Sequence, residues 1–215
     1  MSTNGWLRAA AAAAGAAVVG VLTARGPGRA LDRRLYHAIN RGRGPRADAF
    51  FKGITEFGSI WAAVGATIAL SRMGRRREAL DALGAAVAMW GVGQLAKKAV
   101  MRSRPYESEG EHRLLIKEPR GTSWPSSHPG VLLTYLLVAT RNLGTPAPIR
   151  GALVGMARAV GVSRIYVGVH YPADVVSGLL LGRAVADAWS SAVSPLFLRE
   201  MRSVSSSGAP GTVVA

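Results

Sequence analysis

The segment SRIYVGVHYPAD, residues 163–174, places an arginine, a histidine and an aspartate between two long apolar runs. If the chain after His170 is helical, His170 and Asp174 stand four residues apart and face the same side of that helix. Pro172 favours this structure, because a proline fits the first turn of a helix. A carboxylate that accepts a hydrogen bond from one ring nitrogen makes the other a better nucleophile or base. Arg164 stays charged and can hold an anion beside that imidazole.

A histidine and an aspartate one turn apart are more often an exposed surface pair than a catalytic one. The apolar surroundings change this interpretation, because charged groups beside membrane spans are energetically costly and usually functional. The segment is therefore a candidate site.

The composition of the 215 residues indicates a membrane protein of one domain. Hydrophobic residues make up 49% and charged residues only 18%, which is few charges for a soluble protein. The net charge of +15 is concentrated between the apolar runs. This distribution favours contact with anionic lipid head groups and argues against nucleic-acid binding. The absence of cysteine excludes disulfides, thiolate catalysis and Cys-based metal sites.

Six apolar runs predict an all-α fold, a six-span transmembrane helical bundle, since about 20 helical residues cross the hydrocarbon core. The runs cover residues 9–24, 54–73, 80–95, 131–140, 149–162 and 175–196. The first could instead be a secretory signal, and the fourth is long enough only if its helix begins near His128. Two pairs of spaced glycines, Gly151 with Gly155 and Gly178 with Gly182, predict close helix packing.

The basic segment after the first run, residues 25–52, predicts an amphipathic helix on the membrane surface, because its apolar residues recur at helical spacing among arginines. A solvated linker explains its second half equally well, since glycines and a proline interrupt the pattern. Residues 1–202 are expected to form one membrane-embedded domain, followed by a disordered tail at residues 203–215.

A long polar connection, residues 97–128, joins the third and fourth runs. Lys97 and Arg104 lie about two helical turns apart and can project from one face. Ser126 and Ser127 precede the fourth helix, whose N-terminus attracts anions. Two spans separate this connection from the one that carries His170, so both are expected on the same side of the bilayer and in one pocket.

Each of these residues also has an ordinary interpretation. Lys97 and Arg104 could be cations that extend from a helix end to the membrane surface. Ser126 and Ser127 could be a simple helix cap, and His128 an interfacial histidine. Only their combination with the 163–174 segment favours a catalytic site.

Three sequence blocks resemble the signature of the type 2 phosphatidic acid phosphatases, integral-membrane lipid phosphate phosphatases related in their active site to vanadium haloperoxidases and glucose-6-phosphatase. The blocks are Lys97-x6-Arg104-Pro105, Pro125-Ser126-Ser127-His128 and Ser163-Arg164-x5-His170-x3-Asp174. They extend over about a third of the chain, and their order and spacing are specific. The second block usually contains glycine where this chain has Ser127. That glycine is thought to contribute a backbone N–H, which serine retains.

The resemblance implies a metal-independent mechanism that needs no cofactor. His170 would attack phosphorus and form a phosphohistidine, with Asp174 orienting the ring. His128 would protonate the leaving lipid alkoxide and then activate water. The remaining residues implied by the resemblance stabilise the phosphate oxygens. They are Lys97, Arg104, Arg164, the hydroxyl of Ser126 and the amide of Ser127.

The resulting hypothesis is a multi-pass phosphatase of the cell membrane that cleaves a phosphomonoester or pyrophosphate of a polyprenyl or diacylglycerol lipid. An alternative is a non-catalytic protein that binds or moves lipid phosphates, while the apolar runs disfavour a haloperoxidase. The resemblance implies an extracytoplasmic site. Lys and Arg are more abundant on the catalytic side, however, and the positive-inside rule would place that side in the cytoplasm.

Overall fold

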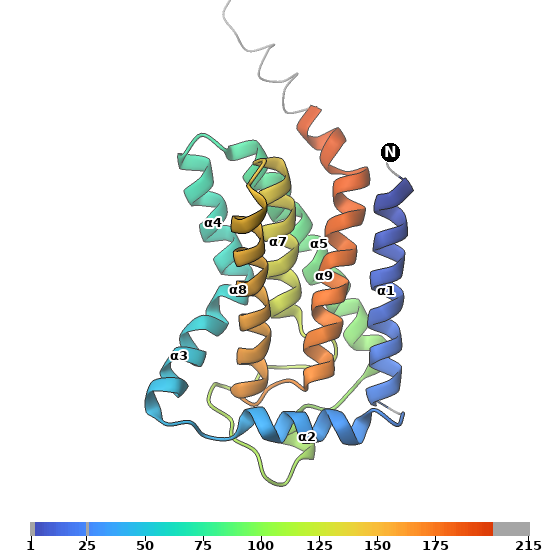
Figure 1. The fold of residues 1–215 in the computed structure, drawn as a ribbon, viewed down its shortest axis with the longest axis vertical. Coiled ribbons are helices and arrows are strands. Elements are labelled where there is room, and N and C mark those ends of the chain that lie inside the picture. Colours follow the sequence, from blue (N-terminus) through green and yellow to red (C-terminus); the bar gives the residue numbers. More distant parts are fainter. Residues whose placement is uncertain (1–2, 25, 200–215) are drawn as a thin grey trace, which may run out of the picture.

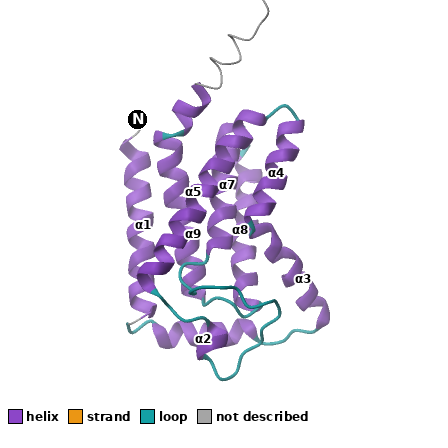
Figure 2. Ribbon diagram, turned by 180° about the vertical axis from the view of Figure 1, so that it is seen from behind, coloured by secondary structure: helices purple, strands orange, loops and turns teal. Residues whose placement is uncertain are grey.

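The computed structural model describes residues 3–24 and 26–199, and within these residues helices joined by loops are the regular secondary structure (Figures 1 and 2). The tail predicted at residues 203–215 lies outside the described residues. The helices are α1 (Thr3–Ala24), α2 (Arg29–Asn40), α3 (Pro45–Thr55), the 3-10 helix η1 (Glu56–Gly58), α4 (Ile60–Arg72), α5 (Arg76–Val100), α6 (Pro105–Ser108), α7 (Ser127–Asn142), α8 (Ala147–Tyr166) and α9 (Pro172–Ala192).

The long helices run side by side, and α2 lies across one end of the bundle (Figure 1). By length and composition, two helical segments can cross a membrane, Asn4–Ala24 and Arg76–Ser108. The bent pair Pro45–Gly58 and Ile60–Arg72 makes a third candidate span if the pair counts as one. Within the described residues, the structure thus supports two or three of the predicted spans by this test.

The run predicted as one helix at residues 54–73 is broken, and its two parts meet at an angle of 67°. Ser59 caps α4, since its side chain accepts a hydrogen bond from the backbone N–H of Ala62 at 3.1 Å. A Cβ on Gly58 would lie 2.7 Å from the Cβ of His128, so only glycine allows this approach. The break therefore brings the start of α4 against the start of α7.

Helix α7 forms the centre of the bundle and is buried along nearly its whole length. It packs against α5, α9, α8 and α4, and its Val131 and Val138 belong to the main hydrophobic core. A helix that is apolar on all sides is typical of a position enclosed by other helices. Its start at Ser127 agrees with the prediction that this helix begins near His128.

Helices α7 and α9 touch through their backbones at glycine residues. A Cβ on Gly182 would lie 2.5 Å from the carbonyl oxygen of Gly130, and one on Gly178 would lie 2.1 Å from that of Ser126. The close packing predicted for Gly178 and Gly182 is confirmed. The same prediction for Gly151 and Gly155 is wrong, because a Cβ at either would meet no atom within 4 Å.

Replacing Gly182 by alanine is therefore expected to lower the free energy of unfolding by about 1–3 kcal/mol, because α7 must move away from α9. Thermal unfolding in detergent measures the effect. Gly151→Ala is the matched control and should be neutral or slightly stabilising, since alanine is the better helix former and the space is open. Equal melting temperatures for Gly182→Ala and the wild type would contradict the tight contact.

The helix expected after the first run is present as α2, and the face that it turns to the bundle carries polar groups beside Tyr36 and Ile39. Leu31 and Leu35 are exposed, whereas Asp32, Tyr36 and Asn40 are buried against the loops of the bundle. The linker interpretation of the second half is wrong, because residues 45–55 form α3.

Candidate active site

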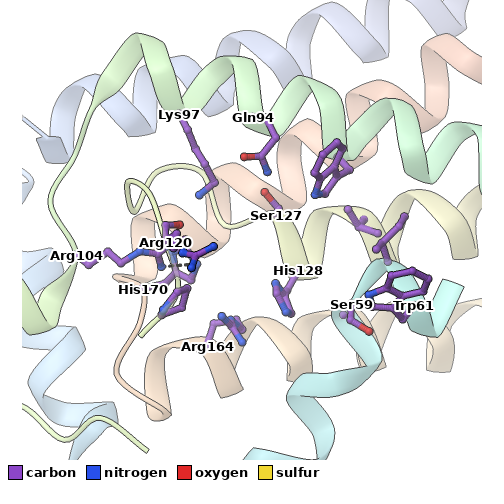
Figure 3. Close-up of a pocket in the computed structure, with 15 residues that line it drawn as sticks. Ser59, Trp61, Gln94, Lys97, Arg104, Arg120, Ser127, His128, Arg164 and His170 are labelled. Atoms are coloured by element: carbon purple, nitrogen blue, oxygen red, sulfur yellow. Dashed lines mark hydrogen bonds between the residues drawn. The ribbon is translucent and has the colours of Figure 1, made fainter. Parts of the chain in front are cut away.

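A cavity of about 270 Å³ lies at the end of the bundle that carries α2 and the long connection (Figure 3). It is lined by residues of the α3–α4 break, α5, the 97–128 connection, α7, α8 and the α8–α9 turn. Six residues named from the sequence line it: Lys97, Arg104, Ser127, His128, Arg164 and His170. The prediction that two distant connections form one pocket is therefore confirmed.

His170 lies in the short turn between α8 and α9 and is buried. Its Nε2 is 3.4 Å from Nη1 of Arg104. A guanidinium has only donors, so this contact favours an unprotonated Nε2 and places the proton of the neutral ring on Nδ1. Nδ1 lies 3.5 Å from Oδ2 of Asp174 and makes no hydrogen bond within the described residues. The carboxylate therefore lies on the Nδ1 side of the ring, and the lone pair of Nε2 points away from it. This is the tautomer that a nucleophile requires.

Burial is the main cause that lowers the pKa of His170 below its ordinary value, and the charges of Arg104, Lys97 and Arg164 lower it further. The imidazole is therefore neutral at physiological pH. A neutral ring can attack phosphorus, whereas a protonated one cannot.

Asp174 lies in the first turn of α9, which begins at Pro172 as the sequence predicts. Its Oδ2 accepts hydrogen bonds from the backbone N–H of Tyr171 at 2.9 Å and from the hydroxyl of Ser123. Its Oδ1 accepts a hydrogen bond from Arg102 at 2.8 Å. The carboxylate is completely buried behind His170 and does not line the cavity.

The three cations named from the sequence are held by neutral oxygen atoms. Lys97 donates to the carbonyls of Thr122 and Pro125 at 2.9 and 3.1 Å. Arg104 donates to the carbonyls of Gly121 and Val169 at 2.7 and 2.9 Å. Arg164 donates to the hydroxyl of Thr55 at 2.9 Å. These bonds fix the side chains without cancelling their charges. An anion that enters the cavity thus meets three preoriented positive charges.

The two serines of the second block differ in position. Ser127 lines the cavity, and its buried Oγ has no hydrogen-bond partner among the described residues. Ser126 is fully buried outside the lining, and its Oγ is likewise unpaired within the described part of the chain. The structure therefore does not bring Ser126 to the pocket surface. The simple cap interpretation also fails for Ser126, whose side chain makes no capping bond.

Several polar residues of the site were missed by sequence reasoning, and Ser59 and Gln94 of the cavity lining are among them. Arg120 adds a fourth cation to the cavity lining (Figure 3), while Arg102 and Ser123 hold Asp174. Arg120 and Ser123 lie in an irregular loop, where no periodicity predicts which side chains turn inward. Arg102 lies inside the first block, but several neighbouring basic residues hide its separate position.

The side chains of the site were also compared with the requirements of a metal site. Within residues 3–24 and 26–199, no group of three or more His, Cys, Asp and Glu side chains is placed to hold a metal ion.

Comparison with known proteins relates the chain to a family. The sequence model of the PAP2 superfamily matches residues 78–196. The decaprenylphosphoryl-5-phosphoribose phosphatase of Mycobacterium tuberculosis is 35% identical over 143 residues, which cover 62% of this chain and 73% of that protein. The crystal structure of LpxE from Aquifex aeolicus has a TM-score of 0.68 and 26% identity over 75% of this chain and 95% of that one.

A transmembrane PAP2-type phosphatidylglycerolphosphate phosphatase of Bacillus subtilis shares the fold, with a TM-score of 0.71 over 86% of this chain and 94% of that one at 18% identity. The family match extends over more than half of the chain and contains all three blocks of the site. The chain therefore belongs to the PAP2 superfamily and is an integral-membrane lipid phosphate phosphatase of this metal-independent hydrolase family.

Proposed function

We propose that this enzyme removes a phosphate group from a polyprenyl-linked lipid through a phosphohistidine at His170. The observation that supports the proposal is the arrangement around that ring. Asp174 lies behind His170. Three cations, Lys97, Arg104 and Arg164, line the same cavity, and each cation donates to a neutral oxygen atom.

In the first step, Nε2 of His170 attacks the terminal phosphorus, and the bond between that phosphorus and the oxygen of the leaving group breaks. His128, on the opposite side of the space in Figure 3, donates a proton to the leaving oxygen. In the second step, His128 takes a proton from water, and the water oxygen attacks phosphorus. Inorganic phosphate leaves and His170 is restored. The three cations and the amide of Ser127 stabilise the phosphate oxygens in both steps, whereas Ser126 would need a local shift to join them.

The shape of the cavity supports a lipid with a phosphorylated head group. Besides the cations, the lining includes Ile60, Trp61 and Trp90 of α4 and α5. Trp61 lies on the side of the cavity away from Lys97 and Arg104 (Figure 3). Trp61 is 77% and Trp90 is 48% exposed, and indole rings are typical of the boundary between head groups and acyl chains. We infer that the head group lies among the cations and that the tail leaves between α4 and α5.

Arg120 favours a head group that carries more than one phosphate. Its side chain is exposed and lies beside Arg104 at the mouth of the cavity. The M. tuberculosis relative is named for a polyprenyl substrate with two phosphate groups, and a polyprenyl diphosphate has the same feature. The substrate class proposed is therefore a polyprenyl lipid with a second phosphate, ahead of a diacylglycerol monophosphate.

We also propose that the six predicted spans are α1, the bent pair α3–α4, α5, α7, α8 and α9. Helix α7 is about 24 Å long at 1.5 Å per residue, and its enclosure by other helices reduces its need for lipid-facing length. The site is proposed to lie on the extracytoplasmic side, with α2 resting on anionic lipid head groups. Labelling of the 109–126 loop by a membrane-impermeant reagent in intact cells tests this orientation, and labelling only after lysis would contradict it.

The function is tested by phosphate release from detergent-purified protein in the presence of EDTA. We expect turnover of a polyprenyl diphosphate at a higher kcat/KM than of phosphatidic acid, and competitive inhibition by vanadate. No release above a protein-free control, with lipid phosphate binding intact, would favour the non-catalytic alternative. Release that depends on an added divalent cation would contradict the proposed mechanism.

A further inference from the structure

Asp174 is held on the side away from the pocket by a buried arginine. Arg102 Nη1 donates to Oδ1 of Asp174 at 2.8 Å. The other oxygen, Oδ2, accepts from Ser123 and Tyr171 and lies 3.5 Å from Nδ1 of His170. Because a carboxylate is planar, the bond to Oδ1 restricts the rotation that would move Oδ2 away from the ring. Arg102 is thus placed to set the direction of the Asp174–His170 contact.

Arg102 is itself anchored by two further residues, Asp32 and Tyr171. Its Nη2 donates to Oδ2 of Asp32 at 2.6 Å, and its guanidinium lies over the ring of Tyr171, 4.1 Å from the centroid. The other oxygen of Asp32 accepts the backbone N–H of Ala173, in the first turn of α9, at 2.8 Å. One carboxylate from α2 therefore holds both Arg102 and the helix turn that carries Asp174.

The position of Arg102 separates it from the phosphate-binding cations. The described residues that line the catalytic cavity do not include it, and it faces a different cavity beside Arg29 and Arg33. Its side chain is only 8% exposed and is paired with two carboxylates. Because Arg102 balances the charge of Asp174 from behind, the cations on the pocket side remain available for phosphate.

We propose that Arg102, anchored by Asp32 of the surface helix α2, is a positioning residue that fixes Asp174 and through it the nucleophilic tautomer of His170. The inference rests on the proposed function of His170. It adds Arg102 and Asp32, which are not among the residues that match the family signature. Neither touches the substrate. Their contribution is to keep the reacting nitrogen aligned, and small losses of alignment reduce rates strongly.

The kinetic test compares Arg102→Met and Arg102→Lys with Arg113→Met. Arg113 pairs with Asp48 of α3 at 2.8 Å and is a matched cation–carboxylate link that does not contact Asp174. We expect Arg102→Met to lower kcat on the order of 10- to 100-fold with little change in KM, Arg102→Lys to recover part of the loss, and Arg113→Met to retain wild-type kcat. A folded Arg102→Met protein with wild-type kcat would overturn the proposal.

The link to α2 is tested by combining variants. Asp32→Asn keeps an oxygen that can accept the Ala173 N–H and loses the charged partner of Arg102. It should therefore lower kcat several-fold in the wild-type background and have no further effect in the Arg102→Met background. Independent, multiplicative losses would show that Asp32 does not act through Arg102. If Arg102→Met does not fold, Arg102→Lys and Asp32→Asn alone decide the question by the split between kcat and KM.

A measurement that needs no turnover separates this inference from the proposed function. Nitrogen-15 NMR of histidine-labelled protein reports which ring nitrogen carries the proton, and the four histidines are assigned with a His170→Gln reference. The wild type should show His170 protonated at Nδ1. Arg102→Met should show a mixture of tautomers, while Lys97, Arg104, Arg164 and His128 remain in place. An unchanged tautomer would overturn the inference even in an active enzyme, and an inactive wild type with the expected shift would overturn only the proposed function.

Discussion

His170→Ala is expected to lower kcat for lipid phosphate hydrolysis by at least about 1,000-fold, because removal of a covalent nucleophile eliminates the reaction path and leaves only binding and charge stabilisation. The substitution leaves Asp174 with its bonds to Arg102, Ser123 and the Tyr171 backbone. The fold should therefore survive. Phosphate release from the purified variant, together with its thermal unfolding, measures both effects.

A second measurement identifies the step that is lost. Wild-type enzyme mixed with labelled lipid phosphate and quenched in alkali should retain label on the protein, since phosphohistidine is stable to alkali, and His170→Ala should retain none. His112→Ala is the matched control, because His112 is exposed and bonds only a backbone carbonyl of the same loop region. An active His170→Ala enzyme, or label that persists on it, would assign the nucleophile elsewhere.

Sequence reasoning located this site because its main residues follow local rules. Pro172 marks the start of a helix, so the spacing of His170 and Asp174 could be converted directly into a shared face. The number of spans between the two connections then placed both on one side of the bundle. The cavity that joins Lys97, Arg104, His128 and His170 follows from these two steps.

The features that were missed depend on tertiary contacts. The break before Ile60 interrupts an apolar run that has no proline, and it places Gly58 directly against His128, a contact that only the folded chain reveals. The inward polar face of α2 cannot be inferred from its leucines, since Asp32 finds its partners 70 and 141 residues away. Arg120 enters the cavity from a loop without regular structure. Ser126 was named from the sequence as a phosphate-binding residue, but its side chain does not line the pocket. Membership of a sequence block therefore did not predict where this side chain points.

The other large effect is expected for His128→Gln, and it should depend on the leaving group. With a phosphomonoester of an alcohol, such as phosphatidic acid, the departing alkoxide needs a proton, so kcat should fall roughly 100- to 10,000-fold. With p-nitrophenyl phosphate the phenolate leaves without one, and attack by His170 should remain close to the wild-type rate. The second step still needs a base for water, so the phosphoenzyme should accumulate.

Alkaline-quench labelling with p-nitrophenyl phosphate measures this accumulation, and a burst of p-nitrophenolate equal to the enzyme concentration should accompany it. Glutamine keeps the side chain polar, and the packing of Gly58 on the Cβ of residue 128 is unchanged by the substitution. The defect therefore reports proton transfer and not a loss of shape. Equal losses for both substrates without any burst would mean that His128 acts before phosphorus is attacked, as a group that orients the phosphate, and the assignment of acid and base would have to move to another residue of the cavity.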